Sequence, residues 1–301
     1  MTDTKGQRQG ILGNLVEFGE MIKISHTLFA MPFAVGAVFL AFSQYDPQQI
    51  SSGWFPILQV VIAVAFARTA AMSFNRWADS EIDGQNPRTA QRSIPAGRLK
   101  SRQVLAATVF SALGFLATCA WISPAALLLS PVVLIVVLGY SYTKRLTWLC
   151  HTVLGTGLGL APVGAWLVVT GDLNQPVPWI LGTAVLFWSA GFDIVYSCQD
   201  IEIDQAQSLQ SIPARFGIPK ALIISRIFHG IMILTLGVLC FVLAFPVALS
   251  LATACAAILL IWGHLLIRSE FRSLNRIENP LLEFNISISG LFLVAMVAEV
   301  F

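Results

Sequence analysis

The sequence predicts an all-α protein that crosses a membrane about nine times. Apolar residues make up 56% of the 301 residues and charged residues only 11%, whereas a soluble domain has roughly 25% charged residues. Long apolar stretches recur along the whole chain, and only helices and closed barrels satisfy their backbone groups in lipid. We therefore expect one integral-membrane domain over residues 1–301, with little chain left for a soluble domain.

The expected helices follow from the spacing of apolar residues. Residues 11–22 carry apolar side chains at helical spacing with acids between them, which predicts a short helix along the membrane surface. The first two spans are expected at about 23–42 and 54–74. Later spans are expected near residues 113, 132, 160, 188, 233, 256 and 290. Small residues between Gly155 and Pro162 favour close packing of the span near 160.

The distribution of basic residues predicts the orientation. Segments 43–53, 122–125, 172–178 and 245–247, which follow alternate spans, contain no Lys or Arg. The segments on the other side hold nearly all of them, and such segments face the cytoplasm. We expect a multi-pass protein of the inner (plasma) membrane of bacterial type, with its N-terminus and its active site on the cytoplasmic side. The net charge of +2 gives no sign of a nucleic-acid partner.

Two similar acidic motifs follow apolar runs far apart in the chain. Each contains Asp-x-Glu-Ile-Asp, at Asp79–Asp83 and Asp200–Asp204, and each leads into Ser-Ile-Pro-Ala, at 93–96 and 211–214. The same features recur in the same order and setting, which indicates an internal pseudo-repeat with acidic motifs at 75–83 and 193–204.

Helical spacing places the acids of each motif on one face. Residues four apart share a face, so one stripe holds Asn75, Asp79 and Asp83, and another holds Asp193, Asp200 and Asp204. Glu81 and Glu202 lie off these stripes. Like charges stacked in this way repel unless a cation lies between them, and Mg²⁺ is commonly held by carboxylates together with substrate phosphates. The alternative is that these are solvated acids at helix ends, but their recurrence favours a metal site.

Basic residues accompany the acids. Arg68 lies inside the second apolar run, on the stripe of Asn75 and Asp79. A charge at that depth is costly and by default functional, so we expect it to contact a phosphate or a carboxylate, or alternatively an acid in a structural pair. The basic loop 84–102 predicts a cap over a polyanion, although the orientation rule alone also accounts for it.

These motifs resemble those of the UbiA superfamily of intramembrane aromatic prenyltransferases, over almost the whole chain. That family carries N-x-x-x-D-x-x-x-D, D-x-x-Y-x-x-x-D-x-x-x-D and Y-x-K-R. Here they stand as Asn75, Asp79 and Asp83; as Asp193, Tyr196, Asp200 and Asp204; and as Tyr142, Lys144 and Arg145. The resemblance implies a bundle of nine helices with a central cavity open laterally to lipid, in which Mg²⁺ bridges both acidic clusters to an isoprenyl diphosphate.

The resemblance also implies roles for individual residues. The expected Mg²⁺ ligands are Asn75, Asp79, Asp83, Asp200 and Asp204. The expected diphosphate-binding residues are Lys144, Arg145, Arg88 and Lys23. Catalytic roles are expected for Asp193, which would orient a phenol hydroxyl, for Arg68, which would bind the aromatic acid's carboxylate, and for Tyr196.

Several functions remain open from the sequence. The expected partners are a polyprenyl diphosphate, a phenolic aromatic acid and membrane lipid. The runs 191–200 and 86–89 resemble the branch that prenylates 4-hydroxybenzoate for ubiquinone, whereas residues 25–32 resemble a branch thought to prenylate a dihydroxynaphthoate for menaquinone. Superfamily members acting on haem, chlorophyllide or homogentisate are further alternatives. A secondary transporter, which can also carry repeats and buried charges, is an alternative of another class.

Overall fold

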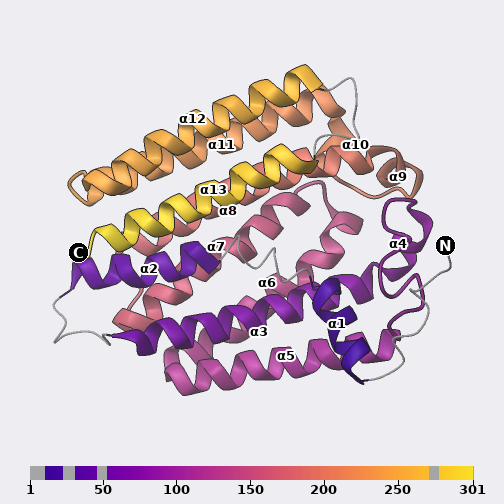
Figure 1. The fold of residues 1–301 in the computed structure, drawn as a ribbon, viewed down its shortest axis with the longest axis horizontal. Helices are drawn as coiled ribbons and strands as arrows, with labels where there is room; N and C mark the ends of the chain where they lie inside the picture. The colour runs from indigo at the N-terminus through magenta and orange to yellow at the C-terminus, as the bar shows by residue number, and fades with distance from the viewer. Residues whose placement is uncertain (1–10, 23–30, 46–52, 271–277, 301) are drawn as a thin grey trace.

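The described part of the molecule is a bundle of helices joined by loops. A computed structural model describes residues 11–22, 31–45, 53–270 and 278–300, and no strand occurs in these ranges (Figure 1). The long helices are α2 (Met31–Gln44), α3 (Trp54–Ala78), α5 (Ser101–Ile122), α6 (Pro124–Leu146), α7 (Cys150–Thr170), α8 (Pro176–Ser197), α11 (Ile218–Val242), α12 (Val247–Glu270) and α13 (Glu278–Ala298). The short ones are α1 (Ile11–Met21), α4 (Ser80–Gln85), η2 (Cys198–Asp200), α9 (Ile201–Ala206) and α10 (Ile212–Phe216).

The predicted all-helical membrane fold is confirmed. Seven helices in the described ranges are long and apolar enough to cross a membrane: α3, α5, α6, α7, α8, α11 and α12. The apolar stretches Met31–Gln44 and Phe284–Ala298 are helical but shorter. The count of nine spans therefore stays a prediction, and part of the first expected span, residues 23–30, lies outside the described residues.

Local sequence signals account for several helix ends. The Ser123 hydroxyl accepts a hydrogen bond of 3.1 Å from the backbone N–H of Ala126 and so caps α6, which begins at Pro124. Helix α7 ends at Gly171, whose φ of 69° is readily adopted only by glycine. Ser123 lies within, and Gly171 directly precedes, a segment that lacks basic residues, on the side opposite the acidic motifs.

Glycines bring α7 and α8 into backbone contact. A Cβ atom at Gly155 would lie 2.5 Å from the backbone oxygen of Leu186, and one at Gly182 would lie 2.7 Å from that of Gly159. No residue larger than glycine fits at such a distance. The close packing predicted from the small residues of this stretch is confirmed, and it sets the spacing of one wall of the site.

The predicted acidic stripes are bent rather than straight. Helix α3 ends at Ala78, and Asp79 adopts φ −97° and ψ 9° before α4 begins. Asp200 adopts almost the same conformation, φ −103° and ψ 6°, between η2 and α9. The first aspartate of each Asp-x-Glu-Ile-Asp motif therefore turns the chain at the same point. The predicted stripes therefore bend at this aspartate, which has nearly the same backbone conformation in both motifs.

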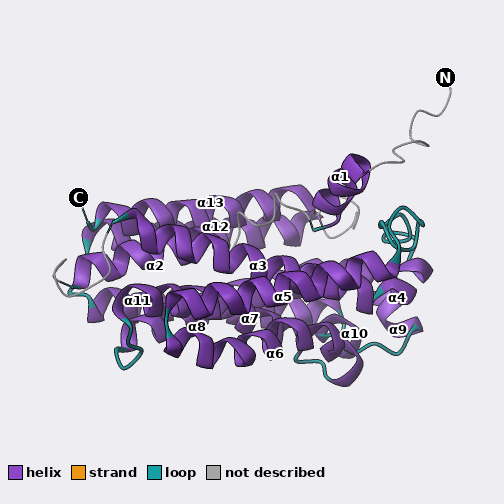
Figure 2. Ribbon diagram, turned by 90° about the horizontal axis from the view of Figure 1, so that it is seen from below, coloured by secondary structure: helices purple, strands orange, loops and turns teal. Residues whose placement is uncertain are grey.

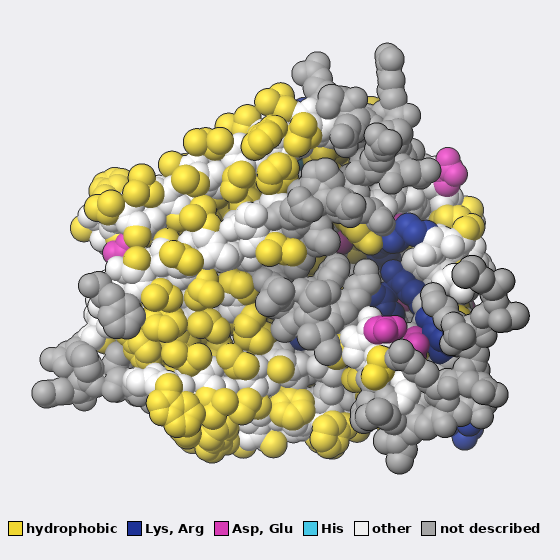
Figure 3. Space-filling model, in the orientation of Figure 1, with side chains coloured by type: hydrophobic (Ala, Val, Ile, Leu, Met, Phe, Trp, Pro, Cys, Tyr) yellow, Lys and Arg dark blue, Asp and Glu magenta, His cyan; other side chains and the backbone are white. Residues whose placement is uncertain are grey.

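The acidic motifs lie at one end of the bundle. Figure 1 shows α4 and α9 together at the right, and Figure 2, which colours all the helices alike, shows them together again from below. Helix α1 also lies at this end, where Phe18, Met21 and Ile22 pack against Leu99 and Val104. In Figure 3, apolar side chains cover the long helices, and most charged side chains gather near α4.

Candidate active site

A cavity of about 750 Å³ runs through the middle of the bundle, mainly between α3, α6, α7 and α8. Every predicted site residue that the structure describes lines it: Arg68, Asn75, Asp79, Asp83, Arg88, Lys144, Arg145, Asp193, Tyr196, Asp200 and Asp204. Lys23, predicted to bind diphosphate, lies outside the described residues. Residues that are up to 136 positions apart in the chain thus meet around one space.

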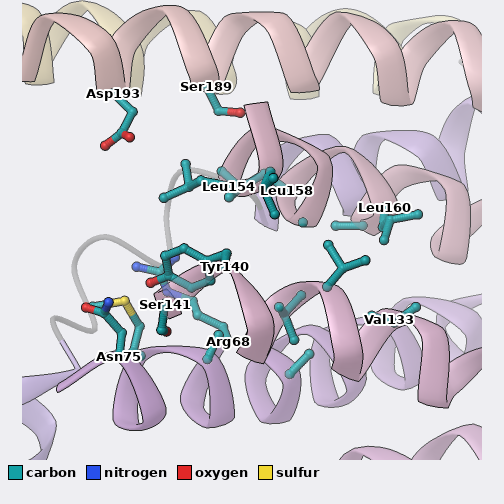
Figure 4. Close-up of a pocket in the computed structure, with 18 of the residues that line it drawn as sticks. Arg68, Asn75, Val133, Tyr140, Ser141, Leu154, Leu158, Leu160, Ser189 and Asp193 are labelled. Carbon is teal, nitrogen blue, oxygen red and sulfur yellow. The ribbon is translucent and has the colours of Figure 1, made fainter. Parts of the chain in front are cut away.

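The cavity has a charged end and an apolar body. The charged end is formed by α4, the loop after it, the end of α6 and the segment from Asp193 to Asp204. The body is lined by Val133, Val137, Leu154 and Leu158, and the far end by Trp179, among other residues. Figure 4 shows Arg68, Asn75 and Tyr140 on one side of this space and Asp193 and Ser189 on the other.

In the first acidic motif, each aspartate contacts a basic side chain. Asp79 accepts hydrogen bonds from Asn75 Nδ2 at 2.9 Å and from Arg145 Nη2 at 3.0 Å. Asp83 accepts one from Arg92 Nη1 at 2.5 Å. Arg145 comes from the end of α6 and Arg92 from the basic loop, so the pairs tie both elements to the motif.

The second motif is held in the same way. Asp200 accepts hydrogen bonds from Arg88 Nε at 2.9 Å and Nη2 at 2.5 Å, and from Asn86 Nδ2 at 3.1 Å. Asp204 contacts Lys144 Nζ at 3.4 Å and accepts a hydrogen bond of 2.8 Å from the Ser211 hydroxyl. Arg88 and Asn86 follow the first motif in the chain, so this loop joins the two acidic motifs across the site.

The surroundings disfavour the charged form of Asp79 but favour that of Arg88. Burial, together with the charge of Asp83, raises the pKa of Asp79 above its usual value, and Arg145 only partly opposes this. Burial lowers the pKa of Arg88, but its hydrogen bonds and ion pair with Asp200 outweigh burial and raise it. A further positive charge beside Asp79 would therefore be stabilising, whereas Arg88 stays charged at any ordinary pH.

The oxygen donors fit a hard cation, although they do not form a finished metal cage. Within the described ranges, no group of three or more His, Cys, Asp or Glu side chains is arranged to hold a metal ion. However, Asp83 Oδ2 is buried and has no hydrogen-bond partner among the described residues. A buried carboxylate oxygen requires a donor or a cation. The five predicted Mg²⁺ ligands remain a prediction, and these donors have the chemistry that Mg²⁺ prefers.

The three predicted catalytic residues lie along the cavity wall. The Asp193 side chain is 28% exposed, and its Oδ2 lies 2.7 Å from His151 Nδ1. The Tyr196 hydroxyl accepts a hydrogen bond of 3.0 Å from Arg88 Nη1, whose guanidinium carbon lies 5.3 Å from the tyrosine ring centre. Arg68 faces the cavity from α3, deeper than Asn75.

Sequence reasoning missed two residues of this site. Arg76 is not among the predicted site residues, yet it is only 8% exposed, lines the cavity and interacts with the charges of Asp83 and Asp79. His151 is not among them either, yet its Nδ1 lies 2.7 Å from Asp193 Oδ2. The position of Arg76 inside the acidic motif was a usable signal, whereas nothing in the sequence connects His151 with Asp193.

Comparisons with known proteins point to one family. The model of the UbiA prenyltransferase family matches residues 28–284. The chain is 32% identical over 198 residues to the 4-hydroxybenzoate octaprenyltransferase of Pseudomonas fluorescens (strain Pf0-1), covering 62% of this chain and 61% of that protein. It is 31% identical over 157 residues to the enzyme of that name from Photobacterium profundum, covering 52% and 54%. These matches thus span little more than half the length of the relatives.

Solved structures share the fold. A UbiA homologue from Aeropyrum pernix K1, determined in an apo form, superposes with a TM-score of 0.81 at 29% identity, covering 92% of this chain and 99% of that one. A homologue from Archaeoglobus fulgidus bound to GPP and Mg²⁺ has a TM-score of 0.72 at 20% identity, covering 94% and 99%. At that lower identity the likeness shows the fold alone.

Proposed function

Because this chain belongs to the UbiA prenyltransferase family, we propose that it transfers a polyprenyl group from a polyprenyl diphosphate to a ring carbon of a phenolic aromatic acid. One observation carries the proposal: a single cavity joins an end rich in acids and basic residues to an apolar body. The charged end suits a diphosphate with its metal ions, and the apolar body suits a prenyl chain.

The basic residues at the charged end are the proposed diphosphate ligands. Lys144, Arg145 and Arg88 each contact an aspartate, and each could turn to a phosphate oxygen as charge enters the site. Arg76 adds a buried guanidinium that faces the same space. Lys23 stays a proposed ligand on sequence grounds alone.

The acidic residues are proposed to hold magnesium. Asn75, Asp79, Asp83, Asp200 and Asp204 supply oxygen donors on both sides of the space where the diphosphate would lie. When bound there, Mg²⁺ would neutralise charge that develops on the diphosphate as the carbon–oxygen bond breaks. Release of Arg92 from Asp83 would free both oxygens of that carboxylate for the ion.

The acceptor is proposed to lie between Asp193 and Arg68. Asp193 would accept a hydrogen bond from the phenol hydroxyl and so raise the electron density of the ring, while Arg68 would bind the acid's carboxylate. The ring carbon then forms a bond to the allylic carbon as the diphosphate leaves, and the ring loses a proton to regain aromaticity. Tyr196 holds Arg88 at the charged end. The apolar walls keep out water that would otherwise capture the allylic cation.

We propose 4-hydroxybenzoate as the acceptor, since the relatives from Pseudomonas fluorescens and Photobacterium profundum are named for it. The feature that favoured a dihydroxynaphthoate, residues 25–32, lies mostly outside the described residues. The protein is an integral membrane protein, and we propose that the charged end opens at the cytoplasmic face of a bacterial-type inner membrane, where soluble acids and diphosphate are exchanged.

The test is an assay of membranes that contain the protein. Radiolabelled polyprenyl diphosphate is supplied with 4-hydroxybenzoate or a dihydroxynaphthoate, with and without EDTA, and products are identified by mass spectrometry. We expect a prenylated 4-hydroxybenzoate that disappears with EDTA and returns with Mg²⁺. A prenylated product formed only from the dihydroxynaphthoate would show that this acid, and not 4-hydroxybenzoate, is the acceptor. Uptake of labelled compound without any product would overturn the enzyme and favour a transporter.

A further inference from the structure

We propose that His151 is a positioning residue that fixes the carboxylate of Asp193 against the cavity. This inference rests on the proposed function, because Asp193 matters only if an acceptor binds there. His151 is fully buried in the wall behind Asp193 and does not line the cavity. It therefore acts through Asp193 rather than on a substrate.

The hydrogen bonds of His151 define which ring nitrogen carries the proton in the neutral imidazole. The backbone N–H of Ile212 lies 3.3 Å from Nε2 and can only donate, so Nε2 accepts. In the neutral imidazole, the proton is then on Nδ1, which donates to Asp193 Oδ2 at 2.7 Å. The imidazole ring therefore accepts a hydrogen bond from the backbone N–H of Ile212 and donates one to the carboxylate of Asp193.

The approach of two helices makes this contact possible. His151, Gly155 and Gly159 lie four residues apart on one face of α7, and that face packs against α8. The two glycines bring the α8 backbone too close for any side chain between them. His151 comes at the end of this stripe, where the helices leave room for an imidazole and the carboxylate of Asp193.

The ring itself is held by the segment that follows the second acidic motif. Gln210 N–H donates to the backbone oxygen of Lys144 at 2.6 Å, and the next two residues both contact the site. Ser211 donates to Asp204, and Ile212 donates to His151. The stretch 210–212 thus holds both Asp204, a proposed metal ligand, and His151, the hydrogen-bond partner of Asp193.

Loss of this link would leave Asp193 free to turn. Its charge already interacts with that of Lys144, a proposed diphosphate ligand. With His151 in place, Oδ2 is occupied, and Oδ1 has no hydrogen bond to a described residue, so it is available to a phenol. Without His151, the carboxylate can turn toward the charge of Lys144, and the acceptor loses its partner.

The experiment compares three variants of the full chain in membranes. His151→Gln can still donate to Asp193 and accept from Ile212, His151→Phe can do neither, and Thr152→Val is a matched control one residue away, outside the cavity lining. For His151→Phe we expect the KM for the aromatic acid to rise and kcat to fall, each about 10-fold or more, with the diphosphate KM little changed. His151→Gln should stay within about threefold of the parent protein.

A second measurement does not depend on turnover. ¹⁵N-histidine-labelled protein has four histidines, and the difference between its spectrum and that of His151→Gln isolates the His151 signals. We expect a protonated Nδ1 and an unprotonated Nε2. The opposite tautomer, or a Phe variant that is folded and as active as Thr152→Val, would overturn the inference. If His151→Phe does not fold, loss of activity in His151→Gln would overturn the inference instead. Failure of the proposed function itself would appear differently, as a parent protein that makes no product.

Discussion

At the scale of single residues, the aspartates of the two motifs are neutralised in pairs. Arg145 and Arg92 contact the first motif, and Arg88 and Lys144 contact the second. Removal of one partner from a buried pair leaves an uncompensated charge. The pairs therefore keep the site stable and also hold the basic residues close to where a diphosphate would bind.

Asp83 is the most informative aspartate for the metal prediction, because one of its oxygens is buried without a hydrogen-bond partner among the described residues. Asp83→Asn keeps the shape and removes the charge. We expect the rate of prenyl transfer to fall about 100-fold or more, and Mg²⁺ binding, measured by calorimetry, to weaken. Glu81→Gln, which changes an exposed acid in the same motif, should leave both quantities unchanged. Equal losses in the two variants would contradict a specific role for Asp83.

Arg76 provides a test of the diphosphate site. Loss of a charged hydrogen-bond donor costs about 1.5–3 kcal/mol, so we expect Arg76→Gln to raise the KM for polyprenyl diphosphate about 10- to 100-fold, with little change in the KM for the aromatic acid. Steady-state kinetics with each substrate varied in turn would show this. Arg102→Gln, at an exposed position outside the cavity, is the control. A similar KM for polyprenyl diphosphate in both variants would show that Arg76 does not bind the diphosphate.

At the scale of elements, periodicity predicted the helices well but not their bends. The span expected near residue 233 is α11, Ile218–Val242, because apolar spacing determines where such a helix lies. The turns at Asp79 and Asp200 were missed, since residues four apart keep the same spacing whether or not the helix bends. Ion pairs such as Arg88 with Asp200 were missed for another reason: they depend on how distant elements pack.

The contact between α7 and α8 can be tested by adding one methyl group. In Gly155→Ala the new Cβ would lie 2.5 Å from the Leu186 oxygen, so the helices must separate. We expect a loss of about 1–3 kcal/mol in stability, measured as a lower Tm, together with a higher KM for the aromatic acid as Asp193 moves. Gly237→Ala, where a Cβ meets nothing within 4 Å, should show neither change. A Tm for Gly155→Ala equal to that of the control would contradict the close contact.

At the scale of the whole molecule, the two acidic motifs meet because the loop after the first reaches over to the second. Asn86 and Arg88 bind Asp200, and Gln207 donates to Gln85 at 3.1 Å. The sequence predicted the members of this site from their repeated spacing and their family resemblance. It could not predict that Arg88 would bind an acid of the other motif, because that contact exists only when both halves are folded together.

The length of the cavity leads to a prediction about prenyl chains. Val133 lines the cavity eleven residues before Lys144 on α6, which is about 16 Å along the helix axis. If the chain follows the cavity, Val133→Phe should lower kcat/KM for a long-chain diphosphate about 10-fold and leave that for a short-chain one unchanged. Leu128→Phe, at a side chain that is 78% exposed on the outside of the same helix, should affect neither. If the long-chain and short-chain diphosphates reacted equally well with Val133→Phe, the prenyl chain would not extend along the cavity as far as Val133. It would instead pass from the charged end of the cavity into the lipid.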